Sequence, residues 1–212
     1  MISRPLPPGA GAPPAQDATP GGRRSYALES MSQWLHSQER LQILDFGGIN
    51  QHNLDYVTGL GHRLYSDDLL LSYECFFTAE ERRTQQFDSA RMEDFLDQTL
   101  DFPDQSADGA LLWDTLQFLP GPLGQAVLDR VHRVLAPDSL VLALFHAESA
   151  GPEAIQQCCR ILDERQLMVA PRGHRRPIVT FTPRGIEKFF RRFQALKFFL
   201  TRDNLQEIIA RR

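Results

Sequence analysis

Four short apolar runs, separated by stretches with helical periodicity, constrain the fold of this chain more than any other feature. The runs cover residues 41–46, 62–65, 109–113 and 139–145. Between them, apolar residues recur every three or four positions, which predicts helices. Strands that alternate with helices predict an α/β fold with a mostly parallel central sheet and right-handed crossovers. The last run is apolar on both faces, as interior parallel strands are.

Weaker patterns predict the remaining elements. Proline after threonine at Thr182 marks the start of one helix, because threonine caps helices and proline suits their first turn. The other expected elements are helices over 26–38, 52–58, 69–88, 123–135, 155–162 and 203–211, and strands over 92–96 and 196–200.

The first 24 residues differ from the rest of the chain. Ten of them are Pro or Gly, and such a stretch buries too little apolar surface to offset its ordering entropy. It also lacks the apolar core of a secretory signal. We therefore predict a disordered arm over 1–24 and a single folded domain over 25–212.

Charge is distributed unevenly along the chain, although the net charge is only −4. Residues 172–212 carry eleven Lys and Arg against three acids. Such a region indicates a basic face for an anionic partner. The alternative is that it packs against the acidic remainder of the chain or forms a solvated helix face.

Composition argues against membrane and metal-binding classes. No run approaches the roughly 18 apolar residues of a membrane helix. The three cysteines, Cys75, Cys158 and Cys159, are too few and unsuitably spaced for a disulfide framework or a zinc site. We expect a reducing, cytoplasmic compartment, no metal and no membrane partner.

Acids and glycines follow the first two predicted strands. Asp45, Gly47 and Gly48 end the first, and Asp67 ends the second, twenty residues after Gly47. Ligands of open α/β sheets bind at the carboxyl ends of the strands, where glycines admit a close approach and an acid can accept hydrogen bonds from ribose hydroxyls. The spacing therefore predicts a nucleoside cofactor at this edge.

Four segments resemble the class I S-adenosylmethionine-dependent methyltransferases of the type 11 kind. Residues 43–48 (Ile-Leu-Asp-Phe-Gly-Gly) resemble the first cofactor motif, and residues 64–67 (Leu-Tyr-Ser-Asp) the second strand with its ribose-binding acid. Residues 100–119 and 128–140 are similar to the fourth strand and to the helix and turn before the fifth. The resemblance implies a Rossmann-like class I methyltransferase fold over 25–212, S-adenosyl-L-methionine as cofactor and a small-molecule methyl acceptor.

The resemblance also implies roles for individual residues. Asp114 and His146, just past the fourth and fifth strands, are the candidates for a catalytic base. The residues implied at the cofactor are Asp45 at the methionine amino group, Gly47 and Gly48 for a close approach of the backbone, Asp67 at the ribose, Asp97 at the adenine and Trp113 near the transferred methyl. If the loop after Gly48 takes a path different from the family's, Asn50 and Gln51 are expected to contact the methionine carboxylate.

These assignments have structural alternatives. Gly47 and Gly48 can simply make a turn, and Asp67 can cap the next helix. Trp113 can belong to the core, where large aromatic side chains are usually found. A lone histidine such as His146 is often a satisfied structural group.

The loop after Gly48 departs from the family, which has glycines where this chain has Ile49 and Gln51. Two functions remain open: a methyltransferase whose loop takes another path, and a methyltransferase-like pseudoenzyme that serves as a binding or scaffold protein. RNA methylation through the basic region is a weaker idea, because nucleic-acid binding is unlikely for an otherwise acidic chain. The oligomeric state is not predicted.

Overall fold

The computed structural model describes residues 22–147, 154–201 and 205–212. Its elements are, in chain order, β1 (Gly22–Arg24), α1 (Tyr26–His36), β2 (Gln42–Asp45), α2 (Gln51–Gly59), β3 (Arg63–Ser66), α3 (Leu69–Phe76), α4 (Ala79–Thr84), α5 (Ser89–Thr99), β4 (Ala107–Trp113), the 3-10 helix η1 (Thr115–Phe118), α6 (Gly121–Val134), β5 (Leu135–His146), β6 (Gln157–Ile161), β7 (Gln166–Pro171), α7 (Pro183–Phe189), β8 (Ala195–Leu200) and β9 (Leu205–Arg211).

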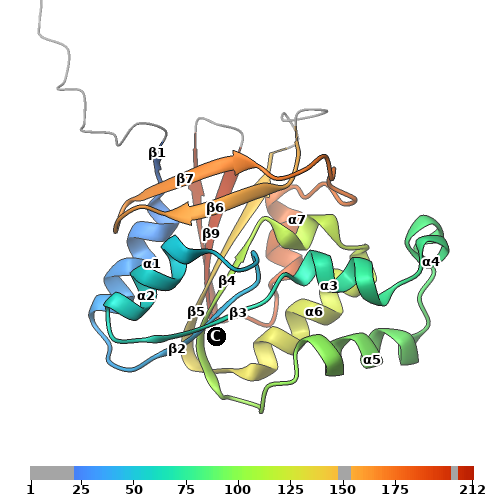
Figure 1. Ribbon diagram of the computed structural model, residues 1–212, viewed down its shortest axis with the longest axis horizontal. Coiled ribbons are helices and arrows are strands. Elements are labelled where there is room, and N and C mark those ends of the chain that lie inside the picture. Colours follow the sequence, from blue (N-terminus) through green and yellow to red (C-terminus); the bar gives the residue numbers. More distant parts are fainter. Residues whose placement is uncertain (1–21, 148–153, 202–204) are drawn as a thin grey trace, which may run out of the picture.

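A six-stranded sheet in the order β3-β2-β4-β5-β9-β8 forms the centre of the molecule (Figure 1). β3, β2, β4 and β5 run parallel, and β9 runs antiparallel to both of its neighbours. The predicted α/β, Rossmann-like fold, with a mostly parallel central sheet flanked by helices, is confirmed. A second, antiparallel sheet in the order β1-β7-β6 lies at the top of the view in Figure 1.

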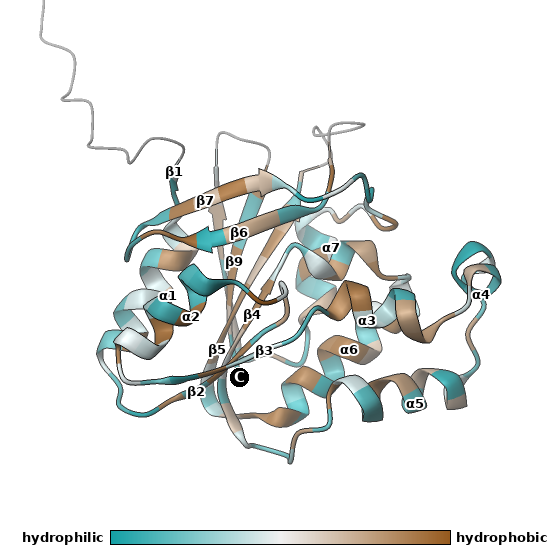
Figure 2. Cartoon of the chain, in the orientation of Figure 1, coloured by the Kyte–Doolittle hydropathy of each residue, from teal (hydrophilic) through white to brown (hydrophobic). Residues whose placement is uncertain are grey.

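Each face of the central sheet has its own hydrophobic core. One core packs Ile43 and Leu111 against α1, α2 and the β6–β7 hairpin. The other core packs Leu44 and Ala110, which are adjacent to Ile43 and Leu111 on the same strands, against α3, α5, α6 and α7. Successive side chains point to opposite faces of a strand, so strands covered on both sides must be apolar throughout. Figure 2 shows the middle strands coloured as hydrophobic accordingly.

A buried carboxylate ties the two ends of the described chain together. Glu207 on β9 is fully buried and accepts hydrogen bonds from the Ser25 hydroxyl (3.0 Å) and the Ala27 amide (2.8 Å). Arg23 on β1 forms an ion pair with the same carboxylate. Ser25 also caps α1, accepting from the Leu28 amide. The first helix is therefore anchored to β9.

Several predicted elements differ from the structure. The helix expected over 69–88 is two helices, α3 and α4, because Thr78 begins a new capping box with Glu81. The strand expected over 92–96 is wrong. It lies inside α5, which begins at the Asp88 cap and buries Phe95 and Leu96 on one face.

The helices expected over 155–162 and 203–211 are also wrong. The first segment contains β6, which pairs with β7. The second contains β9, whose Ile208 and Ile209 enter opposite cores. A strand covered on both faces is apolar at adjacent positions, and a short apolar run of this kind cannot be told from a buried helix by periodicity.

The predicted disordered arm over 1–24 falls mostly outside the described residues. Its last three residues are an exception, because Gly22–Arg24 form β1 and pair with β7. The folded part therefore begins at least three residues earlier than the sequence predicts.

Candidate functional site

The carboxyl ends of four parallel strands gather most of the residues singled out in the sequence. β3 lies on one side of β2 and β4 on the other, which makes the β2–β4 crevice the topological switch point where ligands of such sheets bind. Asp45 ends β2, Trp113 ends β4 and His146 ends β5. Asp67 follows β3, so the predicted grouping of these residues at one edge agrees with the topology.

Asp45 is buried and its carboxylate is fully engaged by the protein itself. Oδ1 accepts from the Gly47 amide at 2.9 Å and from Trp113 Nε1 at 2.7 Å. Oδ2 accepts from Asn53 Nδ2 at 3.0 Å. Burial raises the pKa of Asp45, and these three hydrogen bonds oppose that shift. Asp45 therefore fixes the loop that follows β2 through hydrogen bonds to other groups of the protein.

The indole of Trp113 covers Gly47. A Cβ placed on Gly47 would lie only 2.4 Å from Trp113 Cδ1, so a glycine is required there by the protein's own packing. Trp113 itself has a positive φ of 48°, which is strained for a bulky side chain. The side chain that closely approaches Gly47 is thus the Trp113 indole.

Arg172, which follows β7, covers the second glycine. It donates from Nη1 to the Gly47 carbonyl at 2.7 Å and forms an ion pair with Asp68 through Nη2. Gly48 has a φ of +90°, and a Cβ there would lie 3.0 Å from Arg172 Nη1. Both glycines therefore face side chains of this chain.

Asn50 and Asn53 fasten the start of α2 to β6. Asn50 caps α2 by accepting from the His52 amide, and it donates to the Cys159 carbonyl at 3.2 Å. Asn53 donates to the same carbonyl at 3.2 Å and accepts from the Ile161 amide at 2.9 Å. Both polar atoms of the Asn50 side chain are thus bonded, one to α2 and one to the β6–β7 hairpin.

Ile49 and Gln51, the two departures from the family loop, do not crowd the site. Ile49 is 89% exposed, and Gln51 is exposed and donates to Asp55 at 2.6 Å. The loop therefore takes a path that directs both side chains to solvent. Trp113 and Arg172 fill the space instead.

Asp67 differs from Asp45 and Asp114 because it is not buried. Its half-buried carboxylate accepts from the Asp68 amide at 2.7 Å and lies 3.4 Å from the Ser72 hydroxyl. The neighbouring Asp68, and not Asp67, caps α3 by accepting from the Leu71 amide. The capping alternative thus applies to Asp68.

Asp114 and His146 form a buried acid–base pair. Asp114 Oδ2 lies 3.5 Å from His146 Nε2 and accepts from the Gln157 amide of β6 at 2.8 Å. Burial raises the pKa of Asp114, and the contact with His146 opposes the shift. His146 Nε2 is buried without a hydrogen bond in the described residues. Asp114 and His146 can therefore share a proton at a place that bulk water does not reach.

Asp97 is not brought to this edge. Its assignment depended on a third strand, and the structure has α5 there. Asp97 is exposed on that helix and pairs with Arg130 of α6 at 2.8 Å. The premise of the adenine assignment is therefore wrong.

Sequence reasoning missed Asn53 and Arg172. Asn53 is the third residue of α2, and a polar residue at a buried helix position is a usable signal. Arg172 lies in a segment without a readable motif, and only its place in the basic region singled it out.

S-adenosylmethionine fits one half of this edge and not the other. Asp67 can accept ribose hydroxyls, because among the described residues its carboxylate accepts hydrogen bonds only from the Asp68 amide and, at 3.4 Å, from the Ser72 hydroxyl. Trp113 and Arg172 occupy the faces of Gly47 and Gly48 that a methionine moiety would need. In this arrangement the residues do not fit the methionine half.

The described residues contain neither a candidate membrane span nor a candidate metal cluster. No helix among the described residues is long and apolar enough to cross a membrane. Within the same ranges, no group of three or more His, Cys, Asp and Glu is placed to hold a metal ion.

Comparisons find likeness in fold and not in sequence. No family model and no curated protein matches the chain. A Burkholderia thailandensis 1,6-didemethyltoxoflavin-N1-methyltransferase, solved with 1,6-didemethyltoxoflavin and S-adenosylhomocysteine, is 16% identical, with 88% of this chain and 78% of that chain covered and a TM-score of 0.47. A SAM-dependent methyltransferase from Archaeoglobus fulgidus is 11% identical, with 87% and 94% covered and a TM-score of 0.49.

Proposed function

We propose that this chain is an S-adenosylmethionine-dependent methyltransferase acting on a small-molecule acceptor. The observation that carries the proposal is that Asp67 and the Asp114–His146 pair lie at the same edge of the sheet, beyond the carboxyl ends of β3, β4 and β5. An acid for a ribose and a buried acid–base pair at one switch point suit a nucleoside cofactor and a proton-bearing acceptor. The neighbours solved with S-adenosylhomocysteine are consistent with this choice.

Each residue has a distinct role in the proposal. The bound cofactor would supply an electrophilic methyl group. Asp67 would accept the ribose hydroxyls, and His146 Nε2 would receive the proton of the acceptor, with the Asp114 carboxylate 3.5 Å away stabilising the resulting charge. Burial of both groups keeps water from competing for that proton. A free, exposed Cys75 thiol suits the reducing, cytoplasmic compartment that we also propose.

Binding of the methionine half requires Trp113 and Arg172 to leave the two glycines. The left-handed backbone of Trp113 favours such a movement, because strain of this kind is released when the residue changes conformation. The Arg172–Asp68 ion pair is partly exposed, and exposed ion pairs are weak.

Calorimetric titration with S-adenosylhomocysteine tests the proposal. The wild type should bind, and Asp67→Asn should bind roughly tenfold more weakly or worse, because hydrogen bonds to a charged group are lost. Asp101→Asn, an exposed acid outside the site, is the matched control and should bind like the wild type. Equal affinities of wild type and Asp67→Asn would overturn the ribose assignment.

A scaffold without cofactor is the second candidate function. The filling of the space at Gly47 and Gly48 by Trp113 and Arg172 favours it. Arg172→Ala separates the two candidates in the same titration, because it uncovers Gly48. Binding by the wild type supports the methyltransferase. Absence of binding by both proteins, or binding by Arg172→Ala alone, would identify the natural chain as the scaffold.

A further inference from the structure

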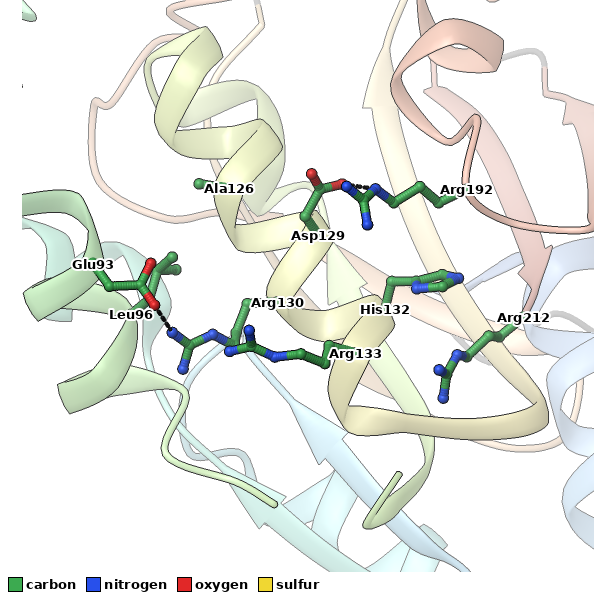
Figure 3. Close-up of a pocket in the computed structure, with 9 residues that line it drawn as sticks. All are labelled: Glu93, Leu96, Ala126, Asp129, Arg130, His132, Arg133, Arg192 and Arg212. Atoms are coloured by element: carbon green, nitrogen blue, oxygen red, sulfur yellow. Dashed lines mark hydrogen bonds and ion pairs between the residues drawn. The ribbon is translucent and has the colours of Figure 1, made fainter. Parts of the chain in front are cut away.

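A pocket of about 500 Å³ lies at the edge of the sheet opposite the candidate site. Its main wall is the last part of α6, which leads into the start of β5, and Arg212 follows the end of the antiparallel β9. Both belong to the amino ends of the parallel strands, whereas Asp45 and Asp67 lie beyond the carboxyl ends. The volume falls within the range of small-ligand pockets. The lining residues, shown in Figure 3, are Glu93, Leu96, Ala126, Asp129, Arg130, His132, Arg133, Arg192 and Arg212.

Arginine dominates the charge of this lining. Four arginines face two acids, Glu93 and Asp129. Glu93 bonds to Arg130 at 2.5 Å, and Asp129 lies 3.2 Å from Arg192. Figure 3 shows these two pairs on opposite sides of α6, with Arg133 and Arg212 extending below them.

The ion pairs around the pocket are mostly solvent-exposed. Asp97 and Asp104, which pair with Arg130 and Arg133 from outside the lining, are 63% and 67% exposed. Arg192 is 54% exposed. Exposed pairs contribute little, so Arg133 and Arg192 can exchange a carboxylate for a ligand oxygen without loss of the fold.

Arg212 provides an independent sign of a missing acceptor. Its Nη1 is buried and has no hydrogen-bond partner among the described residues. A buried donor on a charged group is costly to leave unsatisfied. An anion in the pocket would supply the acceptor.

The environment of His132 agrees with a positive local potential. Burial is the main cause that lowers its pKa, and Arg212 is the next. The dipole of α6 accounts for cations in its last turn, namely His132 and Arg133. It does not account for Arg192 and Arg212, which follow α7 and β9.

We propose that this pocket binds the phosphate group of a small phosphorylated molecule, with Arg133, Arg192 and Arg212 as its ligands. Arginine forks match the oxygens of a phosphate group and bind it with charge-assisted hydrogen bonds. The pocket is larger than one phosphate needs, which leaves room for an organic part beside Leu96 and Ala126. This site does not depend on the proposed methyltransferase activity.

A small ligand suits the pocket better than a nucleic acid. Asp97, Asp104, Glu93 and Asp129 form an acidic rim around the arginines. A polyanionic backbone would have to pass over these carboxylates, and like charges at such distances repel it. A single phosphate reaches the arginines without that penalty.

Titration with glucose 6-phosphate, inorganic phosphate and sulfate at low ionic strength tests the proposal. The wild type should bind glucose 6-phosphate, and Arg212→Gln and Arg133→Gln should each bind it roughly tenfold more weakly, the effect of one lost charge-assisted hydrogen bond. Arg191→Gln is the matched control, since Arg191 is exposed and does not line the pocket. It should bind like the wild type. Tighter binding of glucose 6-phosphate than of phosphate would identify an organic ligand, and equal affinities would identify free phosphate.

Three outcomes would overturn the proposal. The first is no binding of any of the three probes by the wild type. The second is equal weakening by Arg191→Gln and Arg212→Gln, which would show a diffuse charge effect. The third is a single-stranded oligonucleotide that binds and is not displaced by glucose 6-phosphate. Because Arg133 is exposed, its variant remains informative even if Arg212→Gln folds poorly.

Discussion

The two edges of the central sheet use polar groups in opposite ways. At the carboxyl ends, Asp45 and Asn53 bond to each other and Gly47 packs against Trp113, so that these groups have buried partners. At the amino ends, the half-exposed Arg133 and Arg192 pair with Asp104, which is exposed, and Asp129, which is partly exposed, around a pocket. Groups whose partners are buried stabilise the fold, while groups whose partners are solvated remain available for a ligand. Four predictions sharpen this contrast.

Gly47→Ala should have the largest effect. Its new Cβ would lie 2.4 Å from the buried Trp113 ring, so we expect a loss of about 3 kcal/mol in the free energy of unfolding, as for an overpacked core. Urea denaturation measures it. Gly59→Ala is the control, because nothing lies within 4 Å of its Cβ and alanine stabilises a helix. Equal losses for both would contradict the packing of Trp113 on Gly47.

Asn53→Ala should be the next most harmful change. It removes one hydrogen bond each from the Asp45 carboxylate and the Cys159 carbonyl, and it removes the acceptor of the buried Ile161 amide. We expect a loss of about 2 kcal/mol in the free energy of unfolding. Gln51→Ala, which removes one exposed hydrogen bond to Asp55, should change it by less than about 0.5 kcal/mol. An equally small effect for Asn53→Ala would show that the hairpin is not fastened to α2.

Asp114→Asn should change how stability depends on pH. Burial raises the pKa of Asp114 above 3.8, so the folded chain holds a proton that the unfolded chain has lost. The free energy of unfolding therefore falls as the pH rises from 3.8 through the raised pKa.

Asp114→Asn cannot bind that proton. Its free energy of unfolding should therefore rise relative to that of the wild type as the pH increases over this interval. Asp45 changes stability with the same sign in both proteins and cancels in the comparison. Unfolding curves at several pH values provide the measurement, and Asp101→Asn is the exposed control. Parallel pH curves for wild type and Asp114→Asn would argue against a buried, proton-holding pair.

Arg192→Gln should have the smallest effect. It breaks a half-exposed pair with Asp129, so we expect a loss of about 0.5 kcal/mol that disappears in high salt. Thermal melts at low and high ionic strength measure it. A large, salt-independent loss would place Arg192 among the structural groups and weaken the contrast between the two edges.

Sequence patterns located the parallel half of the sheet because its strands carry local signals. Asp45 and Asp67 follow apolar runs, and the run that ends at Trp113 lies between acids. The order and spacing of strand, helix and strand were enough to predict that these residues lie at strand ends. The grouping of Asp67, Asp114 and His146 at one edge follows from that spacing as well.

The remaining parts depend on contacts between distant segments. β6 and β9 are strands because they pair with β7 and β5, and nothing local distinguishes them from amphipathic helices. Trp113 on Gly47 brings together residues 66 positions apart, and Arg172 reaches Gly47 across 125. The basic region was ambiguous for the same reason. Arg172, Arg175, Arg192 and Arg211 pair with acids of the body, as one of the two interpretations expected.

The anchoring of α1 on Glu207 has a consequence for synthesis on the ribosome. α1 emerges early, but the carboxylate that holds its first turn belongs to β9. β8 also cannot join the sheet before β9 is available, because β9 is its neighbour there. Contacts of such long sequence separation form late, so the nascent chain stays incomplete until residues 205–211 have left the exit tunnel. Until then the edge of β5 lacks its neighbour β9, and an unpaired apolar strand edge of this kind makes the incomplete chain prone to aggregate.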